Sequence, residues 1–154
     1  MRRFAPMGEG LRHAALMVAA GVGIPVLAAL NAALGLRIGS GNAAAVVLFS
    51  VALAAALAVL VATGEAKALG RVAGQPPVLF LAGCLVAFYI LSITHVAPRF
   101  GLARAIQCVL LGQLVSAALI DAIGLAGLAS RPVSAERLLG LGLMTAGVLL
   151  SQRG

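Results

Sequence analysis

AALMVAAGVGIPVLAALNAALGL, residues 14–36, is a long apolar stretch near the N-terminus without a single charged residue. About 20 apolar residues, at a rise of about 1.5 Å each, let a helix cross the roughly 30 Å hydrocarbon core of a bilayer. The stretch is too long for the apolar core of a signal peptide, and further apolar stretches follow it. It therefore predicts a first transmembrane helix, with Pro25 and Asn31 inside it.

Four more apolar stretches follow, separated by short segments that carry charged residues, Gly or Pro. They predict transmembrane helices over residues 43–63, 76–96, 102–120 and 135–151. The connections are predicted as turns or polar loops over residues 37–42, 64–75, 98–101 and 121–134. No linker divides the chain. The sequence thus predicts an all-α polytopic membrane protein with five transmembrane helices, forming a single domain over residues 1–154.

The composition agrees with a membrane protein and argues against several other classes. Hydrophobic residues make up 62% of the 154-residue chain, charged residues make up 10%, and the mean hydropathy is +1.13. The net charge is +7, but Lys and Arg lie between the apolar stretches without interleaved aromatic residues, so nucleic acid is not an expected partner. The sequence offers no metal-ligand cluster, phosphate-binding loop or nucleophile with its base. We therefore expect no cofactor, no metal and no enzymatic activity, and a chain surrounded by lipid.

The distribution of Lys and Arg predicts how the chain inserts into the membrane. Five helices place the two termini on opposite sides. One side carries Arg2, Arg3, Arg12, Lys67, Arg71, Arg131 and Arg137, and the other carries Arg37, Arg99, Arg104 and Arg153. This weak bias favours a cytoplasmic N-terminus and is compatible with insertion in both orientations. Two copies in opposite orientations would form a ten-helix antiparallel dimer with the inverted symmetry of many transporters.

Polar side chains inside the predicted helices need a partner, a cavity or a substrate. Asn31 follows Pro25 by one and a half turns, and either joins two helices by a hydrogen bond or lines a substrate cavity. In the third helix, Tyr89, Ser92 and His95 recur at spacings of three and so share one face. His95 lies near the membrane end, where an interfacial position is expected. Tyr89 and Ser92 lie deeper and are candidate cavity residues.

The predicted fourth helix carries the most polar residues. Arg104 and Gln107 share a face near its start, and Gln113 and Ser116 share another. Asp121 closes the helix about 25 Å from Arg104, so these two residues cannot pair within one chain.

Two environments are open to Asp121. In an antiparallel dimer it would reach basic residues of the other copy, namely Arg37, Arg99 and Arg104. The alternative is a solvated carboxylate beside Arg131 or Arg137 of its own chain, and the residues alone favour this alternative.

Three stretches together resemble a known family. They read GIPVLAALNAALGLRIGS (23–40), VAPRFGLARAIQCVLLGQLVSAALIDAIGL (96–125) and RPVSAERLLGLGLMTAGVLL (131–150). The first-helix Asn31, the pair Gly112 and Gln113, Asp121 and Gly124 occur in the order and spacing of the YdcZ-type inner-membrane exporters of the drug/metabolite transporter (DMT) superfamily. The chain departs from the family pattern in two places, with Leu27 where the family has Gln and Ala52 where it often has Gly.

The resemblance implies a five-helix unit that occurs in the family singly, as paired genes or fused into ten-helix proteins. We therefore expect a small-solute secondary transporter, an exporter of the inner membrane, which works by alternating access as a dual-topology dimer with itself or a paralogue. The expected substrate-binding residues are Asn31, Gln107, Gln113, Tyr89 and Ser92. The expected charges at the mouths or the interface are Asp121, Arg104, Arg37 and Arg99.

The acid-free turns around these arginines hint at an anionic or zwitterionic solute, but a topology signal explains the arginines as well. Two other functions stay open. A dual-topology channel would need polar groups along a pore. A non-transporting helper subunit of a membrane complex would need no solute site at all.

Overall fold

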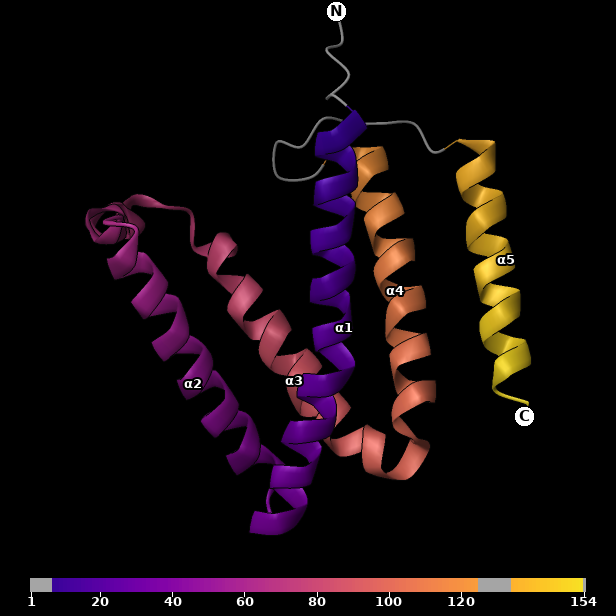
Figure 1. Ribbon diagram of the computed structural model, residues 1–154, viewed down its shortest axis with the longest axis horizontal. Coiled ribbons are helices and arrows are strands. Elements are labelled where there is room, and N and C mark those ends of the chain that lie inside the picture. The colour runs from indigo at the N-terminus through magenta and orange to yellow at the C-terminus, as the bar shows by residue number, and fades with distance from the viewer. Residues whose placement is uncertain (1–6, 125–133, 154) are drawn as a thin grey trace, which may run out of the picture. The chain divides into compact units, whose positions relative to one another are not determined.

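The computed structural model describes residues 7–124 and 134–153, and these form helices and turns with no strand among them. The α-helices are α1 (Met7–Ile38), α2 (Gly41–Ala62), α3 (Leu81–Phe100), α4 (Leu102–Ile123) and α5 (Ala135–Ser151) (Figure 1). The all-α prediction is confirmed for the described residues. Arg2, Arg3, Arg131 and residues 125–133 of the predicted loop lie outside them.

Four helical segments are long and apolar enough to cross a membrane, namely Gly10–Ile38, Gly41–Ala62, Pro77–Phe100 and Leu102–Ile123. These confirm the first four predicted spans. Helix α5 begins and ends where the fifth span was predicted, but it has only 17 residues. At about 1.5 Å per residue it is about 25 Å long, somewhat less than a typical hydrocarbon core.

The structure corrects three of the predicted connections. Pro98 lies inside α3 and not in a tight turn, because its fixed φ suits a helix and the cost is one lost backbone hydrogen bond. The chain instead reverses direction between α3 and α4 at Gly101, whose φ is 93°. Helix α4 continues to Ile123 and ends at Gly124, which adopts the left-handed conformation, so Asp121 lies within its last turn.

The segment predicted as a polar loop over residues 64–75 is also partly helical. It contains the exposed 3-10 helix η1 (Ala66–Gly74), and a second 3-10 helix, η2 (Pro77–Phe80), leads into α3. With four residues η2 has the usual length of a 3-10 connector, whereas η1, with nine, is longer than most. The pattern of Lys67 and Arg71 among small residues gave no signal for this.

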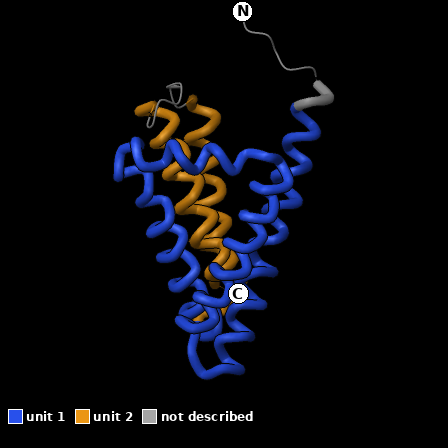
Figure 2. The backbone as a smooth tube through the Cα atoms, turned by 90° about the vertical axis from the view of Figure 1, so that its left-hand side faces the viewer, with its two compact units in different colours: residues 1–99 blue, residues 100–154 orange. Residues whose placement is uncertain are grey.

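The chain divides into two compact units, residues 1–99 and 100–154 (Figure 2). The prediction of a single domain therefore stays a prediction. In the first unit, α1 and α2 form an antiparallel hairpin, and α3 contributes a buried face of Ile90, Ile93, Thr94 and Ala97. In the second unit, α4 and α5 run antiparallel to each other.

The α1–α2 hairpin turns within two residues. Gly39 adopts the left-handed conformation (φ 73°), and the N–H of Ser40 donates to the carbonyl of Gly35 at 3.0 Å, which closes α1 with a Schellman motif. The hydroxyl of Ser40 then caps α2 by accepting from the N–H of Ala43 at 3.2 Å. Because one residue serves both caps, the start of α2 lies directly against the last turns of α1.

Candidate functional site: polar side chains within the apolar helices

Among the described residues of the first unit, Asn31 is the most deeply buried polar one. Only 4% of it is exposed, and its Nδ2 donates to the Thr94 hydroxyl of α3 at 2.6 Å. Its carbonyl oxygen Oδ1 is buried and has no hydrogen-bond partner among the described residues. An amide carries two donor hydrogens and an oxygen that accepts. The single hydroxyl of Thr94 engages the nitrogen and leaves the oxygen free to accept.

Close backbone approach brings Asn31 and Thr94 together. A Cβ added to Gly35 would lie 3.1 Å from Cα of Gly41, and one added to Gly41 would lie 3.2 Å from Cγ2 of Thr94. Small residues permit such approach between helices, in membranes above all. The three helices of the first unit thus meet around the Asn31–Thr94 hydrogen bond.

A groove of about 280 Å³ runs between α1 and α2 beside this hydrogen bond. We call it the Asn31 groove. Its lining residues are Leu27, Leu30, Asn31, Leu34, Val47, Leu48 and Val51. Asn31 supplies its polar character, since each of the other residues is Leu or Val.

The three polar residues predicted to share a face of α3 have different environments. The hydroxyl of Tyr89 is enclosed and has no hydrogen-bond partner among the described residues. Ser92 is half-buried, and His95 is exposed. The imidazole Nε2 of His95 faces the guanidinium of Arg99 one turn later, within hydrogen-bonding distance. His95 and Arg99 also border a more polar hollow of about 420 Å³ beside the α1–α2 turn.

In the second unit, α4 and α5 are joined at both ends. The hydroxyl of Ser151 donates to Oε1 of Gln107 at 2.8 Å, and Arg137 donates to Oδ2 of Asp121 at 2.7 Å. Residues 137 and 151 are as far apart in sequence as residues 107 and 121. The two helices therefore keep one antiparallel register over about 21 Å.

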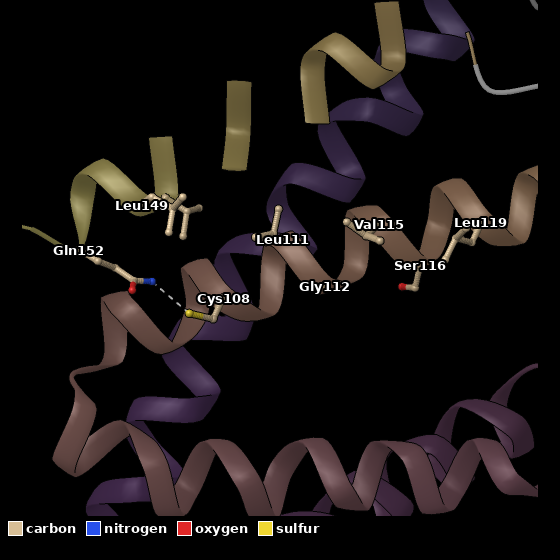
Figure 3. A pocket seen from close by; sticks show the side chains of 9 residues that line it. Cys108, Leu111, Gly112, Val115, Ser116, Leu119, Leu149 and Gln152 are labelled. Carbon is tan, nitrogen blue, oxygen red and sulfur yellow. Dashed lines mark hydrogen bonds between the residues drawn. The ribbon is translucent and has the colours of Figure 1, made fainter. Parts of the chain in front are cut away.

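A second groove, of about 530 Å³, lies between these helices (Figure 3). Its lining residues are Cys108, Leu111, Gly112, Val115, Ser116, Leu119, Val148, Leu149 and Gln152. At one end, Gln152 donates to the sulfur of Cys108 at 3.1 Å, drawn as a dashed line in Figure 3. The two polar side chains at this end are thus already bonded to each other, and the remaining surface is mostly apolar.

Gln113 differs from Gln107, although both were predicted to line one site. Its side chain is exposed and takes part in no hydrogen bond among the described residues. The Ser116 hydroxyl, three residues later, bonds to the backbone carbonyl of Gln113 at 3.1 Å and not to its amide. An exposed amide near the middle of an apolar helix would face lipid unless another chain covers it.

The predicted charged residues lie at helix ends. Arg37 and Arg99 occupy the last turns of α1 and α3, and Arg104 lies in the first turn of α4. All three are exposed, and none forms an ion pair within the described part of the chain. Asp121 has the environment that the residues alone favoured, beside Arg137 of its own chain.

The structure distributes the predicted substrate residues over both units. Asn31, Tyr89 and Ser92 belong to the first unit, and Gln107 and Gln113 to the second. Sequence reasoning missed Thr94, although a hydroxyl inside an apolar span was a signal for a partner of Asn31. It also missed Ser151 as the partner of Gln107. That pairing depends on the register of two helices, which no local pattern reveals.

Apolar helices of spanning length, with a few polar groups buried among them, define a multi-pass integral membrane protein. The sequence matches the family described as "Putative inner membrane exporter, YdcZ" over residues 13–150, so the chain belongs to this family. It is accordingly a multi-pass protein of the inner membrane. No curated protein and no solved structure matches the chain.

Proposed function

We propose that this protein is a secondary transporter that exports a small solute by alternating access. The observation that carries the proposal is the buried carbonyl oxygen of Asn31, which has no hydrogen-bond partner among the described residues and belongs to a groove-lining side chain. A buried polar atom without a partner is costly, by about 1–3 kcal/mol, unless a ligand or water satisfies it. A solute that binds and leaves would meet this need in one state of the transport cycle.

A carrier accounts for the polar groups better than a channel does. A channel needs polar groups spaced along a pore. In the Asn31 groove the polarity is confined to one amide, and the remaining lining is Leu and Val. Such a site can recognise one group of a solute but offers no continuous path for water or ions.

We further propose that two copies pair in opposite orientations. Gln113 lies at the middle of α4 (Leu102–Ile123), where a residue meets its own counterpart in an antiparallel helix pair. Two Gln113 amides can then bond reciprocally, which removes both from lipid. Residues 106, 109, 113, 117 and 120 form one stripe of α4 by helical periodicity, and we call this stripe the Gln113 face. The α4 residues bonded to α5 are Gln107, Cys108 and Asp121, which lie outside this stripe.

In this proposal α5 is the fifth transmembrane helix. It is tied to α4 by Arg137–Asp121 at one end and Ser151–Gln107 at the other. A helix that runs beside a membrane-spanning helix over about 21 Å lies in the bilayer over the same length. Modest thinning of the bilayer and snorkelling of Arg137 and Arg153 would accommodate its shortness.

Efflux from proteoliposomes tests the carrier proposal. Vesicles containing the protein and a defined mixture of small metabolites are assayed for solutes that leave, by mass spectrometry. We expect saturable efflux of a subset of solutes, lost in Asn31→Leu and kept in Asn42→Leu, a matched change at an exposed residue of α2. Fast non-saturating ion flux would indicate a channel. If the purified, monodisperse protein supports no flux of any kind, the result would favour a helper subunit.

A further inference from the structure

The chemistry of the Asn31 groove indicates which solutes it can hold. We infer that, in the state of the transport cycle that exposes Oδ1 of Asn31, the groove binds an uncharged, largely apolar solute that donates one hydrogen bond to this oxygen. This inference rests on the proposed function in one respect, because it takes the groove to be the solute site of the transporter. It deepens the proposal by naming the class of solute.

The need for a donor follows from how the Asn31 amide is engaged. Its Nδ2 is already bonded to Thr94 at 2.6 Å, whereas Oδ1 is buried without a partner among the described residues. Carbonyl oxygen only accepts hydrogen bonds. The complementary group on a solute is therefore an N–H or O–H donor, and an ionised carboxylate has none to offer.

The absence of charge follows from the rest of the lining. The groove residues other than Asn31 are Leu and Val, and the groove contains no ionisable side chain. An ionised ammonium would lose its hydration there and gain one neutral acceptor, which is far too little to compensate. A hydroxyl, amide or ring N–H on an apolar body loses much less. The exposed arginines at the helix ends take no part in the lining.

An acyl chain is the competing occupant of any apolar groove in a membrane. It would fill the space between Leu30 and Val47 but has no donor for Asn31, so the buried oxygen would stay unpaired. The groove, of about 280 Å³, has room for several water-sized groups, since one needs about 10–15 Å³ of such space. A one- or two-ring solute with one donor satisfies both the space and the oxygen.

Indole derivatives test the inference because the chain contains no Trp, so indole fluorescence reports the probe alone. The purified full chain in detergent is titrated with indole, with N-methylindole, which lacks the donor, and with the charged analogues tryptamine and indole-3-acetate. Empty micelles provide the background. We expect indole to bind about tenfold more tightly than N-methylindole, since one hydrogen bond to a buried group separates them. Both charged analogues should bind more weakly than indole.

Three variants locate the binding. Asn31→Leu, of similar size, should bind indole and N-methylindole equally, and Asn42→Leu should behave like the unchanged protein. Val47→Phe fills the groove from α2 without touching the Asn31–Thr94 hydrogen bond, so it should lose both probes. It also keeps the test decisive if Asn31→Leu fails to fold.

Several results would overturn the inference. They are no indole binding by the unchanged protein, equal binding of indole and N-methylindole, a preference for a charged analogue, or selectivity that survives Asn31→Leu or Val47→Phe. The proposed transport activity can fail separately. Selective binding without efflux would contradict the proposed transport but support the binding site. Efflux that survives Asn31→Leu would contradict the binding site but support transport.

Discussion

Arg137 Nη1 donates to Asp121 Oδ2 at 2.7 Å and so joins the first turn of α5 to the last turn of α4 within one chain. The carboxylate therefore has a counter-ion without any second copy. The proposed antiparallel assembly does not need an Asp121–Arg104 pair between chains. Its proposed polar contact is Gln113, which has no side-chain partner among the described residues.

The Asp121–Arg137 pair should contribute modestly to stability. Its side chains are 36–40% exposed, and exposed pairs contribute at most about 1 kcal/mol. Asp121→Asn and Arg137→Gln should each lower the unfolding free energy, with a coupling of roughly 0.5–1 kcal/mol in a double-mutant cycle. The same cycle run with Arg104→Gln is the control and should give no coupling. Coupling of Asp121 to Arg104 but not to Arg137 would instead indicate an Asp121–Arg104 pair between two chains.

The close approach of Gly35 and Gly41 should be essential to the first unit. Gly35→Ala would place a Cβ 3.1 Å from the Gly41 backbone, which cannot yield as a flexible side chain can. We expect a loss of about 1–3 kcal/mol in unfolding free energy, as for other overpacked sites. Gly83→Ala in α3 is the matched control, since nothing lies within 4 Å of its added Cβ. If Gly35→Ala left the unfolding free energy unchanged, α1 and α2 would not approach this closely.

Much of this fold is predictable from the sequence, because long apolar stretches specify spans by length alone. The first four spans were found in this way. Helix ends were less predictable. Pro98 and Gly101 both signal a turn, but a proline near a helix end is tolerated at the cost of one hydrogen bond, so the glycine alone marks the reversal.

The candidate site was predictable only in part, because polarity in an apolar helix can be seen in the sequence but its partner cannot. Asn31 stood out, and both interpretations of it were left open. The structure contains the hydrogen bond to Thr94 that the helix-joining interpretation required, and also an unpaired oxygen in a groove-lining residue. Both features depend on the packing of three helices, which the local sequence does not encode.

Gln113 should affect the dimer more than the chain. Gln113→Leu removes an exposed amide without a side-chain partner, so the folding stability of one chain should be unchanged. If the amide pairs with its counterpart, the dimer should weaken by roughly 1 kcal/mol or less, up to about fivefold in the dissociation constant. Gln107→Leu is the matched control, because it breaks the bond to Ser151 and should lower chain stability without loosening the dimer. Analytical ultracentrifugation in detergent measures the dimer.

The orientation of the chain should respond to a few added charges. Because the Lys and Arg counts on the two sides are seven and four, a reporter fused to the C-terminus should be active on both sides of the membrane. Two or three Lys added beside Lys67 in η1 should shift the population to one orientation. One clean orientation of the unmodified chain would argue against a homodimer of opposite orientations and favour pairing with a paralogue.

Disulfide formation between two differently tagged single-cysteine chains tests the antiparallel pairing along the Gln113 face most directly. In a background without Cys84 and Cys108, Ile106→Cys and Ile120→Cys lie on that face about 21 Å apart, one on each side of Gln113. A disulfide requires Cα atoms within about 7 Å. We predict that co-expressed chains cross-link position 106 to position 120, and that neither variant cross-links to itself. Cross-links only between identical positions would show that the copies run parallel and would contradict the dual-topology dimer.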